Sequence, residues 1–515
     1  MNTSIGPVVV FRADASVAIG AGHVMRCLAL ANALRDAGMA CWFAGLAETL
    51  ATVPELARSG HHWIEISAPG NAAAMLHAIA AGGPSSCDWL IVDHYRWNAA
   101  EESQCRGWAR NLLVIDDLAD RPHDCDLLLD QTFGRTDAEY QGLVSPGCKV
   151  LAGASYALLR PEFVAARPAS LKRRADGRLD RVLITMGLTD PAGATTLLVR
   201  QFLKTGLPLK IDVVLGVSAP HLDEVRRIVR ANEGLFEVHV GTTVMAELMS
   251  NADIAFGAAG STSWERCCVG LPSALLVLAD NQKEIADRLA AASAAVQLGT
   301  IDDIEPMAVV RLLNDFRRAP RRLVDMARSA AAICDGRGVH RVAMLLQPEH
   351  SRDGSPVWLR PVTAGDLDLL SQLQSEEGAR QFARNPQIPT PEEHRSWFAR
   401  RLGDPDCLFS IVTCDGQPAG SLRLDQAEAG SFEISIVVSS AFRGRGIGLA
   451  ALTLARRLVP EAELHAEVIA GNIGSEALFT TAGFTPAGYG WRRLPSLLAP
   501  GDASGAERQA FRAHP

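Results

Sequence analysis

The sequence predicts an α/β protein of three domains, in which two doubly wound parallel sheets precede a smaller α+β domain. Three observations support this prediction. The chain has 515 residues, which is too long for a single hydrophobic core. Short apolar runs alternate with helix-length amphipathic stretches through residues 1–167 and again through 168–346. From residue 357 to 497 the order of strands, hairpin and helices follows another plan.

Composition and charge favour small-molecule chemistry. The 48% hydrophobic and 21% charged content is typical of compact domains, and a net charge of -8 argues against a nucleic-acid partner. The opening stretch has no basic region, and its apolar run is interrupted by Arg12 and Asp14, so we expect no signal peptide. No stretch approaches the roughly 18 apolar residues that a membrane span needs. We therefore expect a cytoplasmic protein with no membrane partner.

The first two domains show the strand and helix rhythm of Rossmann-like folds. Apolar runs that read as buried strands are, in order, "PVVVFRAD", "ACWFAGL", "DWLIVDHY", "NLLVIDDL", "DLLLDQT", "RVLITMG", "KIDVVLG", "FEVHVG", "ADIAFGAAG" and "SALLVLA". The polar stretches 168–180 and 347–356 are predicted to be linkers, and 498–515 a loose tail. Because open α/β sheets bind ligands beyond the carboxyl ends of their strands, we expect a cleft between the two domains.

The stretch "AIGAGHVMRC", residues 18–27, is the first candidate site. Gly20 and Gly22 would let backbone N–H groups approach an anion closely at a helix start. His23 would lie at the positive end of that helix, which lowers the pKa of an imidazole and favours its neutral, proton-accepting form. Taken alone, the motif is equally consistent with a helix-start histidine that has no chemical role.

The residues around this motif resemble a known family. "FRADASVAIGAGHVMRC" is similar to the opening signature of the UDP-2,4-diacetamido-2,4,6-trideoxy-β-L-altropyranose hydrolases of pseudaminic acid (nonulosonate) biosynthesis. Further matches in the same order are "VDHY" at 92–95, "YALLRPEF" at 156–163, "GAAGSTSWERCCVGLP" at 257–272, "DNQ" at 280–282 and "DGRGVHRV" at 335–342. The resemblance covers residues 1 to about 346 and implies two facing Rossmann-like domains of the GT-B type.

The resemblance also implies a reaction, in which the UDP-sugar is cleaved at its anomeric C–O bond to UDP and the free sugar. His23 falls on the proposed proton acceptor that activates water, and the scheme needs no metal. The residues that the resemblance and their strand-end positions assign to the substrate in the first domain are Arg12, Asp14, Ser16, Gly20, Gly22, Asp93, Tyr95 and Arg160. For each side chain an ordinary capping, packing or ion-pair role is the alternative.

In the second domain, the turn "GAAGSTSWE" is expected to hold the diphosphate through Gly260, Ser261 and Thr262. Glu265 would accept hydrogen bonds from the ribose hydroxyls. Asn281 and Gln282 resemble the polar pair that faces the sugar. "TMGLTDP" at 185–191 departs from the family, because a leucine replaces the second glycine of the "GGxDP" turn, and phosphate contact at that turn is therefore not expected to be as close.

Residues 357–497 resemble the GNAT N-acetyltransferases, which use acetyl-CoA. The residues that fit their R-x-x-G-x-G loop, the preceding splayed strand and a following asparagine are Val437, Val438, Arg443, Gly444, Arg445, Gly446, Gly448 and Asn472. Glu433 is the candidate general base, with His394 a weaker one. Phe479 stands where the family often has a tyrosine acid, and it cannot donate a proton.

Together these features predict a bifunctional enzyme that N-acetylates a UDP-4-amino sugar and hydrolyses the product. One alternative is a GT-B glycosyltransferase that passes the sugar to an acceptor. Another is a non-catalytic UDP-sugar-binding module with a protein-acetylating or acetyl-CoA-sensing domain. We expect acetyl-CoA as co-substrate and find no sequence cluster typical of metal ligands, since His61 and His62 have no acidic or cysteine neighbour in sequence.

Overall fold

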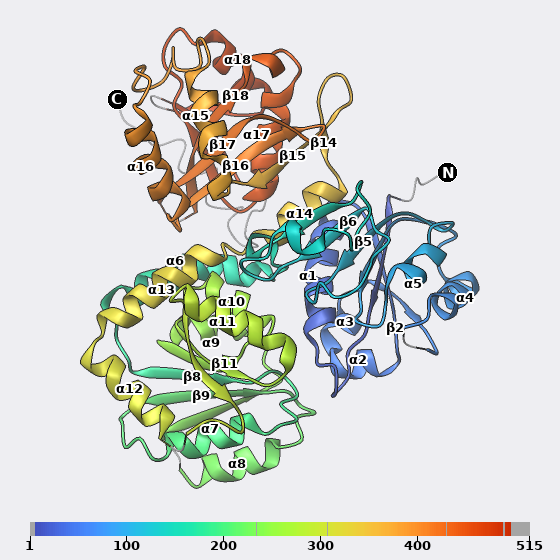
Figure 1. Cartoon of the computed structure of the whole chain (residues 1–515), viewed down its shortest axis with the longest axis vertical. Coiled ribbons are helices and arrows are strands. Elements are labelled where there is room, and N and C mark those ends of the chain that lie inside the picture. The colour runs from blue at the N-terminus through green and yellow to red at the C-terminus, as the bar shows by residue number, and fades with distance from the viewer. Residues whose placement is uncertain are drawn as a thin grey trace, which may run out of the picture. The chain divides into compact units, whose positions relative to one another are not determined.

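The computed structural model describes residues 6–68, 70–232, 234–305, 307–428, 430–487 and 490–495. The predicted tail, 498–515, lies outside these residues. The chain forms two compact units, Met1–Val339 and His340–Pro515 (Figure 1). None of the helices in the described part of the chain combines the length and apolar character that crossing a bilayer requires.

The first unit contains two parallel sheets, as the sequence predicts. The first sheet has seven strands in the order β3-β2-β1-β4-β5-β6-β7. Its strands are β1 (Val8–Ala13), β2 (Ala40–Gly45), β3 (His62–Glu65), β4 (Cys87–Asp93), β5 (Ala109–Ile115), β6 (Leu127–Asp130) and β7 (Lys149–Ala152). Its helices are α1 (Gly22–Asp36), α2 (Glu48–Thr52), α3 (Pro54–Arg58), α4 (Ala72–Gly82) and α5 (Ala99–Gln104). Strands β1, β4, β5 and β6 are almost wholly buried, which is why they read as continuous apolar runs.

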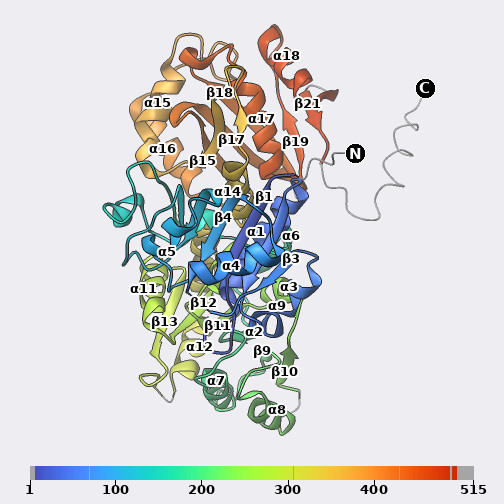
Figure 2. The same cartoon turned by 90° about the vertical axis from the view of Figure 1, so that its right-hand side faces the viewer.

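The second sheet has six strands in the order β10-β9-β8-β11-β12-β13. They are β8 (Arg181–Thr185), β9 (Lys210–Leu215), β10 (Phe236–Val240), β11 (Ile254–Ala258), β12 (Ser273–Val277) and β13 (Ala295–Thr300). The helices are α6 (Pro161–Arg173), α7 (Ala194–Phe202), α8 (Leu222–Arg230), α9 (Met245–Asn251), α10 (Thr262–Cys268), α11 (Lys283–Ala291), α12 (Ala308–Arg318) and α13 (Arg321–Ile333). Helices α7 and α8 lie beside β8, β9 and β10 (Figure 2).

Both sheets reverse their strand order at one point, between β1 and β4 and between β8 and β11. This is the 3-2-1-4-5-6 order of doubly wound nucleotide-binding folds, in which ligands bind beyond the carboxyl ends of the strands at the reversal. Arg12 pairs with Val92, and Ala13 with Asp93, so the motif that follows β1 lies next to the one that follows β4. In both domains the topology therefore places these motifs at the point where folds of this kind bind ligands.

The predicted linker at 168–180 is in part a helix. Residues 168–173 belong to α6, which contains Pro168 and packs against α9 and α10. The guanidinium of Arg174 donates to the carbonyls of Met249 and Ala252, at the end of α9. Basic side chains that read as a solvated linker therefore satisfy helix carbonyls inside the domain.

The second unit is an α+β domain with an eight-stranded mixed sheet in the order β14-β15-β16-β17-β18-β19-β21-β20. Its strands are β14 (Glu349–His350), β15 (Pro356–Pro361), β16 (Cys407–Cys414), β17 (Gln417–Glu428), β18 (Ser431–Val438), β19 (Glu463–Ala466), β20 (Thr485–Ala487) and β21 (Gly490–Arg493). Its helices are α15 (Leu367–Ser375), α16 (Pro391–Leu402), α17 (Ile447–Leu458) and α18 (Ile473–Thr481), and α14 (Gly338–Leu346) leads into it. The short strand β14, within the predicted linker 347–356, pairs with β15, and Met344 lies in the core of this unit.

Candidate active sites

The turn after β1 brings backbone groups together at the reversal point of the first sheet. Gly20 donates its N–H to the carbonyl of Ser16 at 2.8 Å, and the hydroxyl of Ser16 accepts from the N–H of Ile19 at 3.1 Å. Gly20 has a φ of +83°, which favours glycine. A Cβ at Gly22 would lie 3.0 Å from the hydroxyl oxygen of Ser261 in the second domain. The glycines therefore allow the α1 start and the α10 start to approach closely.

His23 is oriented by a buried carboxylate. Its Nδ1 lies 2.5 Å from Oδ1 of Asp93, the last residue of β4. Arg26, one turn along α1, donates to both carboxylate oxygens of Asp93 at 2.6 and 2.7 Å. Burial acts to raise the pKa of Asp93, but the positive Arg26 and the His23 contact outweigh it and hold this pKa well below its usual range. Asp93 is thus a carboxylate that can accept a proton from Nδ1, and in that tautomer the free lone pair of the His23 ring is on Nε2.

Tyr95 connects His23 to the second domain. Its ring meets the His23 ring edge-on with centroids 4.7 Å apart, and its hydroxyl oxygen accepts from the side-chain amide of Asn281 at 3.2 Å. Partial burial, followed by the negative charge of Asp117, raises the pKa of Tyr95 above its usual range, so the phenol keeps its proton. The structure therefore brings His23, Asp93, Tyr95 and Asn281 together, as the predicted site requires.

Arg12 and Asp14 are placed differently from the rest of the predicted substrate-binding residues. They form a buried ion pair at 2.6 Å, and Asp14 also accepts from the N–H of Leu46 at 2.9 Å and lies 3.2 Å from Nε2 of His94. Burial raises the pKa of Asp14, but His94 and Arg12 outweigh it and lower this pKa far below its usual range. In this structure the pair links the end of β1 to the backbone at the end of β2, and neither side chain is exposed.

In the second domain, the predicted nucleotide-binding residues gather near the start of α10. Ser261 is the residue before α10, and a Cβ at Gly260 would lie 4.0 Å from the side-chain nitrogen of Gln282. Burial raises the pKa of Glu265 to about 7, against an opposing effect of Arg160, whose guanidinium lies 3.7 Å from its carboxylate. Arg160 and Glu265 are therefore neighbours, close to the start of α10 at Thr262.

Two other groups of the second domain, the side chain of Gln282 and the turn before α7, form hydrogen bonds within that domain. The side-chain oxygen of Gln282 accepts from the N–H of Leu278 at 3.1 Å, so that group holds its own turn. The carbonyl of Leu188 accepts from the N–H of Gly216 at 2.8 Å, while Asp190 accepts from the first N–H groups of α7 at 3.0 and 2.8 Å. A carboxylate therefore occupies that helix start, where a phosphate would otherwise find N–H donors.

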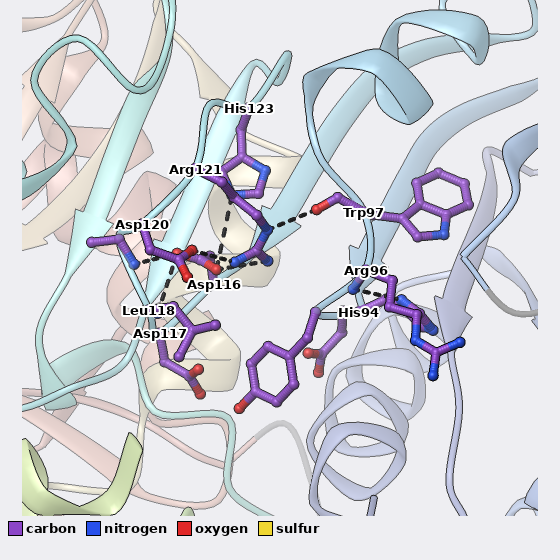
Figure 3. Close-up of polar contacts among 12 residues, drawn as sticks. His94, Arg96, Trp97, Asp116, Asp117, Leu118, Asp120, Arg121 and His123 are labelled. Carbon is purple, nitrogen blue, oxygen red and sulfur yellow. Dashed lines mark hydrogen bonds and ion pairs between the residues drawn. The ribbon is translucent and has the colours of Figure 1, made fainter. Parts of the chain in front are cut away.

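Some residues of the first site were not singled out by sequence reasoning. Arg26 is not among the predicted site residues, yet it donates to Asp93 at 2.6 Å and to Asp117 at 3.3 Å. Asp116 and Asp117 follow β5, and their side chains differ: Asp116 forms an ion pair with Arg121 at 2.9 Å (Figure 3). The sequence does contain a signal for these residues: two consecutive aspartates follow β5, the strand that pairs with β4.

The second unit contains a cleft of about 1400 Å³ beside a strand that separates from its neighbour. Strands β18 and β19 are parallel and pair only through Ser431, Phe432 and Glu433. The remainder of β18, including Val437 and Val438, lines the cleft. This is the splayed strand that the sequence predicts, and its unpaired edge offers backbone groups to an extended ligand.

The glycine-rich loop ends at this cleft. Gly444 and Gly446 have φ values of +77° and +83°, and Gly446 directly precedes α17. A Cβ at Gly448 would lie 3.0 Å from Leu478 of α18, so glycine allows these helices to approach. Arg443 is exposed and lines the cleft, whereas Arg445 forms an ion pair with Asp353 at 2.7 Å. The N–H groups and Arg443 are therefore arranged to receive an anion.

The candidate acid–base residues of this unit have defined partners. The carboxylate of Glu433 accepts from Arg384 at 2.6 Å, and Arg384 also forms an ion pair with Glu467. His394 is buried, and its Nε2 bonds the carbonyl of Leu367 at 3.1 Å, which gives it a structural role. Asn472 caps α18 through its side-chain oxygen, and the buried Phe479 lines the cleft.

A group of residues with metal-ligand side chains lies outside both sites. Asp212, Glu237 and His239, on β9 and β10, bring their ligand atoms within 4.8 Å of one another. Arg181 already pairs with Asp212 at 2.5 and 2.9 Å. The guanidinium of Arg181 already binds both oxygens of the carboxylate that a metal ion would need. We therefore interpret this cluster as an ion-pair network.

Comparison with known proteins finds similar proteins for both parts of the chain. The model of the acetyltransferase (GNAT) domain family matches residues 357–485. The chain is 23% identical over 486 residues to the uncharacterized protein MJ1062 of Methanocaldococcus jannaschii, covering 92% of this chain and 95% of that protein. It is 26% identical over 249 residues to the UDP-2,4-diacetamido-2,4,6-trideoxy-beta-L-altropyranose hydrolase of Campylobacter jejuni, covering 48% of this chain and 82% of the relative.

Among solved structures, MurG of Acinetobacter baumannii matches 66% of this chain and 99% of its own, with 16% identity and a TM-score of 0.49. The chain therefore joins a region related in sequence to a UDP-sugar hydrolase to an acetyltransferase domain of the GNAT family.

Proposed function

We propose that the first unit hydrolyses a UDP-linked diacetamido trideoxy sugar, with His23 as general base. The observation that supports this most directly is the orientation of His23 by the buried carboxylate of Asp93, at a glycine turn that lies against the second domain. The sequence relationship to the hydrolase of Campylobacter jejuni supplies the substrate class. The proposal places the protein in the cytoplasm, in nonulosonate (pseudaminic acid) biosynthesis.

In the proposed reaction, Nε2 of His23 takes a proton from water as the water oxygen forms a bond with the anomeric carbon. The bond between that carbon and the β-phosphate oxygen breaks, and UDP leaves with the electron pair. The negative charge of Asp93, 2.5 Å from Nδ1, stabilises the imidazolium that forms. General-base help of this kind contributes about 10² to 10⁴ in rate, and the scheme requires no metal.

The nucleotide is proposed to bind in the second domain. The backbone of Gly260, Ser261 and Thr262 would hold the diphosphate at the start of α10. The carboxylate of Glu265, when ionised, accepts hydrogen bonds from both ribose hydroxyls, and Arg160 beside it supplies positive charge. Asn281 and Tyr95, which already contact each other at 3.2 Å, would then lie over the sugar.

For the second unit we propose acetyl transfer from acetyl-CoA to the 4-amino group of the UDP-sugar that precedes the hydrolase substrate. The anion-receiving loop at 443–448 and the unpaired edge of β18 fit the pyrophosphate and the pantetheine arm of this co-substrate. Glu433 would take the amine proton, through water, after Arg384 moves from it. The amine nitrogen bonds to the acetyl carbon, the C–S bond breaks, and the thiolate takes a proton from solvent, since Phe479 has none to give.

The first experiment tests hydrolysis. The purified full-length chain is given the UDP-diacetamido sugar without any acceptor, with and without EDTA, and UDP release is followed by phosphorus NMR. We expect UDP and free sugar from the wild type in both conditions, strong loss with His23→Ala, and no loss with His77→Ala, an exposed histidine on α4. Release only when an acceptor is added would indicate a glycosyltransferase. Release by His23→Ala at the wild-type rate would contradict the role of His23.

The second experiment tests acetyl transfer by the same chain. Thiol release from acetyl-CoA is measured with the UDP-4-amino sugar, and then with peptides that have a free N-terminus. We expect thiol and an N-acetylated sugar only with the sugar nucleotide. Thiol release with peptides alone would replace this acceptor with a protein, and release with neither would leave the domain as an acetyl-CoA-binding module.

A further inference from the structure

Asp117 lies at the carboxyl end of β5, beside the strand that carries Asp93 and Tyr95. Its Oδ2 accepts a hydrogen bond from Arg26 at 3.3 Å. The same guanidinium holds Asp93 at 2.6 and 2.7 Å, so one arginine spans carboxylates from two neighbouring strand ends. Asp117 is thereby connected to the carboxylate that orients His23.

The second oxygen of the Asp117 carboxylate lacks a hydrogen-bond donor among the described residues. Oδ1 of Asp117 is buried and has no hydrogen-bond partner among the residues that the structure describes. A buried carboxylate oxygen without a donor is costly, because it has lost its water without replacement. The hydroxyl of Tyr95 is the group on which the charge of Asp117 acts, raising the pKa of that phenol.

Tyr95 has a proton to give. Its hydroxyl oxygen already accepts from the side-chain amide of Asn281 at 3.2 Å, so the phenol O–H remains available as a donor. The amide donor of Asn281 on one side and the negative charge of Asp117 on the other favour one position of the Tyr95 ring. That ring meets His23 edge-on at 4.7 Å.

The neighbouring aspartates, Asp116 and Asp120, form ion pairs with a different arginine. Asp116 pairs with Arg121 at 2.9 Å and accepts from the hydroxyl of Tyr140 at 3.1 Å. Asp120 is 59% exposed in its side chain and pairs with the same arginine at 2.8 Å. Figure 3 shows the carboxylate of Asp117 directed away from this arginine. Of the three, Asp117 is the one that contacts Arg26 and acts on Tyr95.

We propose that Asp117 is a positioning residue of the first site, which holds Tyr95 and Arg26 so that contact with Asn281 of the second domain is coupled to the orientation of His23. Hydrogen bonds run from Asp117 through Arg26 and Asp93 to His23. The charge of Asp117 also acts on the hydroxyl of Tyr95, which Asn281 contacts. The inference rests on the proposed hydrolase function for its catalytic consequence. Asp117 acts through Tyr95 and takes no part in the bond changes.

The test is a double-mutant cycle of Asp117→Asn and Tyr95→Phe, with Asp120→Asn as the matched control. Each single change should lower kcat for UDP release by about 10-fold, and the double variant should be no slower than the single variants, because both remove one coupled contact. Asp120→Asn removes the same charge three residues away and should leave kcat and KM unchanged. Independent losses that multiply in the double variant, or a kcat for Asp117→Asn equal to that of Asp120→Asn, would overturn the inference.

UDP binding, measured by calorimetry on the same variants, separates this inference from the proposed function. The Tyr95–Asn281 contact joins the two domains, so both single changes should weaken UDP binding by about threefold to tenfold, without further loss in the double variant. If the wild type releases no UDP from the sugar, the hydrolase proposal fails. In that case a non-additive binding cycle still supports the positioning role, and an additive or silent cycle overturns it.

Discussion

Replacing Asp93 by asparagine should remove most hydrolysis, because it removes the charge that orients His23. Asp93 accepts from Arg26 twice, at 2.6 and 2.7 Å, and from His23 at 2.5 Å. An asparagine amide has one acceptor oxygen and one donating nitrogen. If the oxygen faces Arg26, the nitrogen faces Nδ1 of His23 and requires the tautomer whose Nε2 carries the proton. That imidazole cannot take a proton from water.

The magnitude follows from the burial of these charges. Removing one partner of a buried ion pair leaves the other uncompensated, which costs about 3 to 5 kcal/mol of stability. For a domain of this size, that corresponds to about 6 to 20 °C in Tm. Loss of the proton acceptor removes the general-base contribution, so kcat should fall by about 10² to 10⁴.

The assay pairs UDP release with thermal unfolding, and Asp116→Asn is the control. Asp116 is as buried as Asp93 and pairs with Arg121 at 2.9 Å, but it has no contact with His23 among the interactions of the described residues. Both variants should lose similar stability, whereas only Asp93→Asn should lose kcat at a temperature where both are folded. A normal kcat for Asp93→Asn, or an equal loss in both, would refute this reasoning.

Three other substitutions test the remaining assignments. Burial raises the pKa of Glu265 to about 7, so UDP affinity should rise by up to about 10-fold from pH 6 to pH 8 as the carboxylate ionises, and Glu265→Gln should remove this dependence in a calorimetric titration. Gly446→Ala and Gly416→Ala both place alanine at positive φ, +83° and +78°, and each should cost about 1 kcal/mol of stability. Only Gly446→Ala should also raise the KM for acetyl-CoA, and equal KM values would contradict a role for this loop in binding. Glu433→Gln should lower kcat for thiol release by about 10- to 100-fold, while Glu467→Gln, which changes the other carboxylate on the same arginine, should not; equal losses would mean that the ion pair alone matters.

The sequence predicts the sheets well because their strands are buried on both faces. Runs such as that in β4 are apolar at nearly every position, which neither a surface helix nor a half-exposed strand would be. Strands β3, β7, β13 and β14 are missed, because each is short or has several partly exposed positions and polar residues. The basic stretch at the end of α6 is misread as a linker, because the helix carbonyls that Arg174 satisfies come from residues 75 and 78 positions away.

For the sites, turns are easier to predict than side-chain partners. The glycines before α1 and α17 have the positive φ values that make a local signature recognisable. Ion pairs depend on which strand ends become neighbours, and this is set by topology. Arg26 meets Asp117 across 91 positions, and Arg384 meets Glu433 across 49. The burial of Arg12 and Asp14 is not predicted either, although the two are only two positions apart. A strand-end position alone does not say whether a side chain faces solvent or an ion-pair partner.

The charges around His23 bear on which end of the substrate lies there. Arg12 and Arg26 are matched against Asp14, Asp93 and Asp117, which leaves one excess negative charge. A diphosphate would be repelled by this cluster, whereas the turn at Ser261 and the nearby Arg160 would attract it. In the proposed reaction, positive charge develops on His23 and on the anomeric carbon while negative charge moves to the departing UDP. The negative cluster beside His23 and the turn at Ser261, where an anion is proposed to bind, would stabilise both changes. The substrate should therefore bind with its sugar toward His23 and its nucleotide toward Glu265.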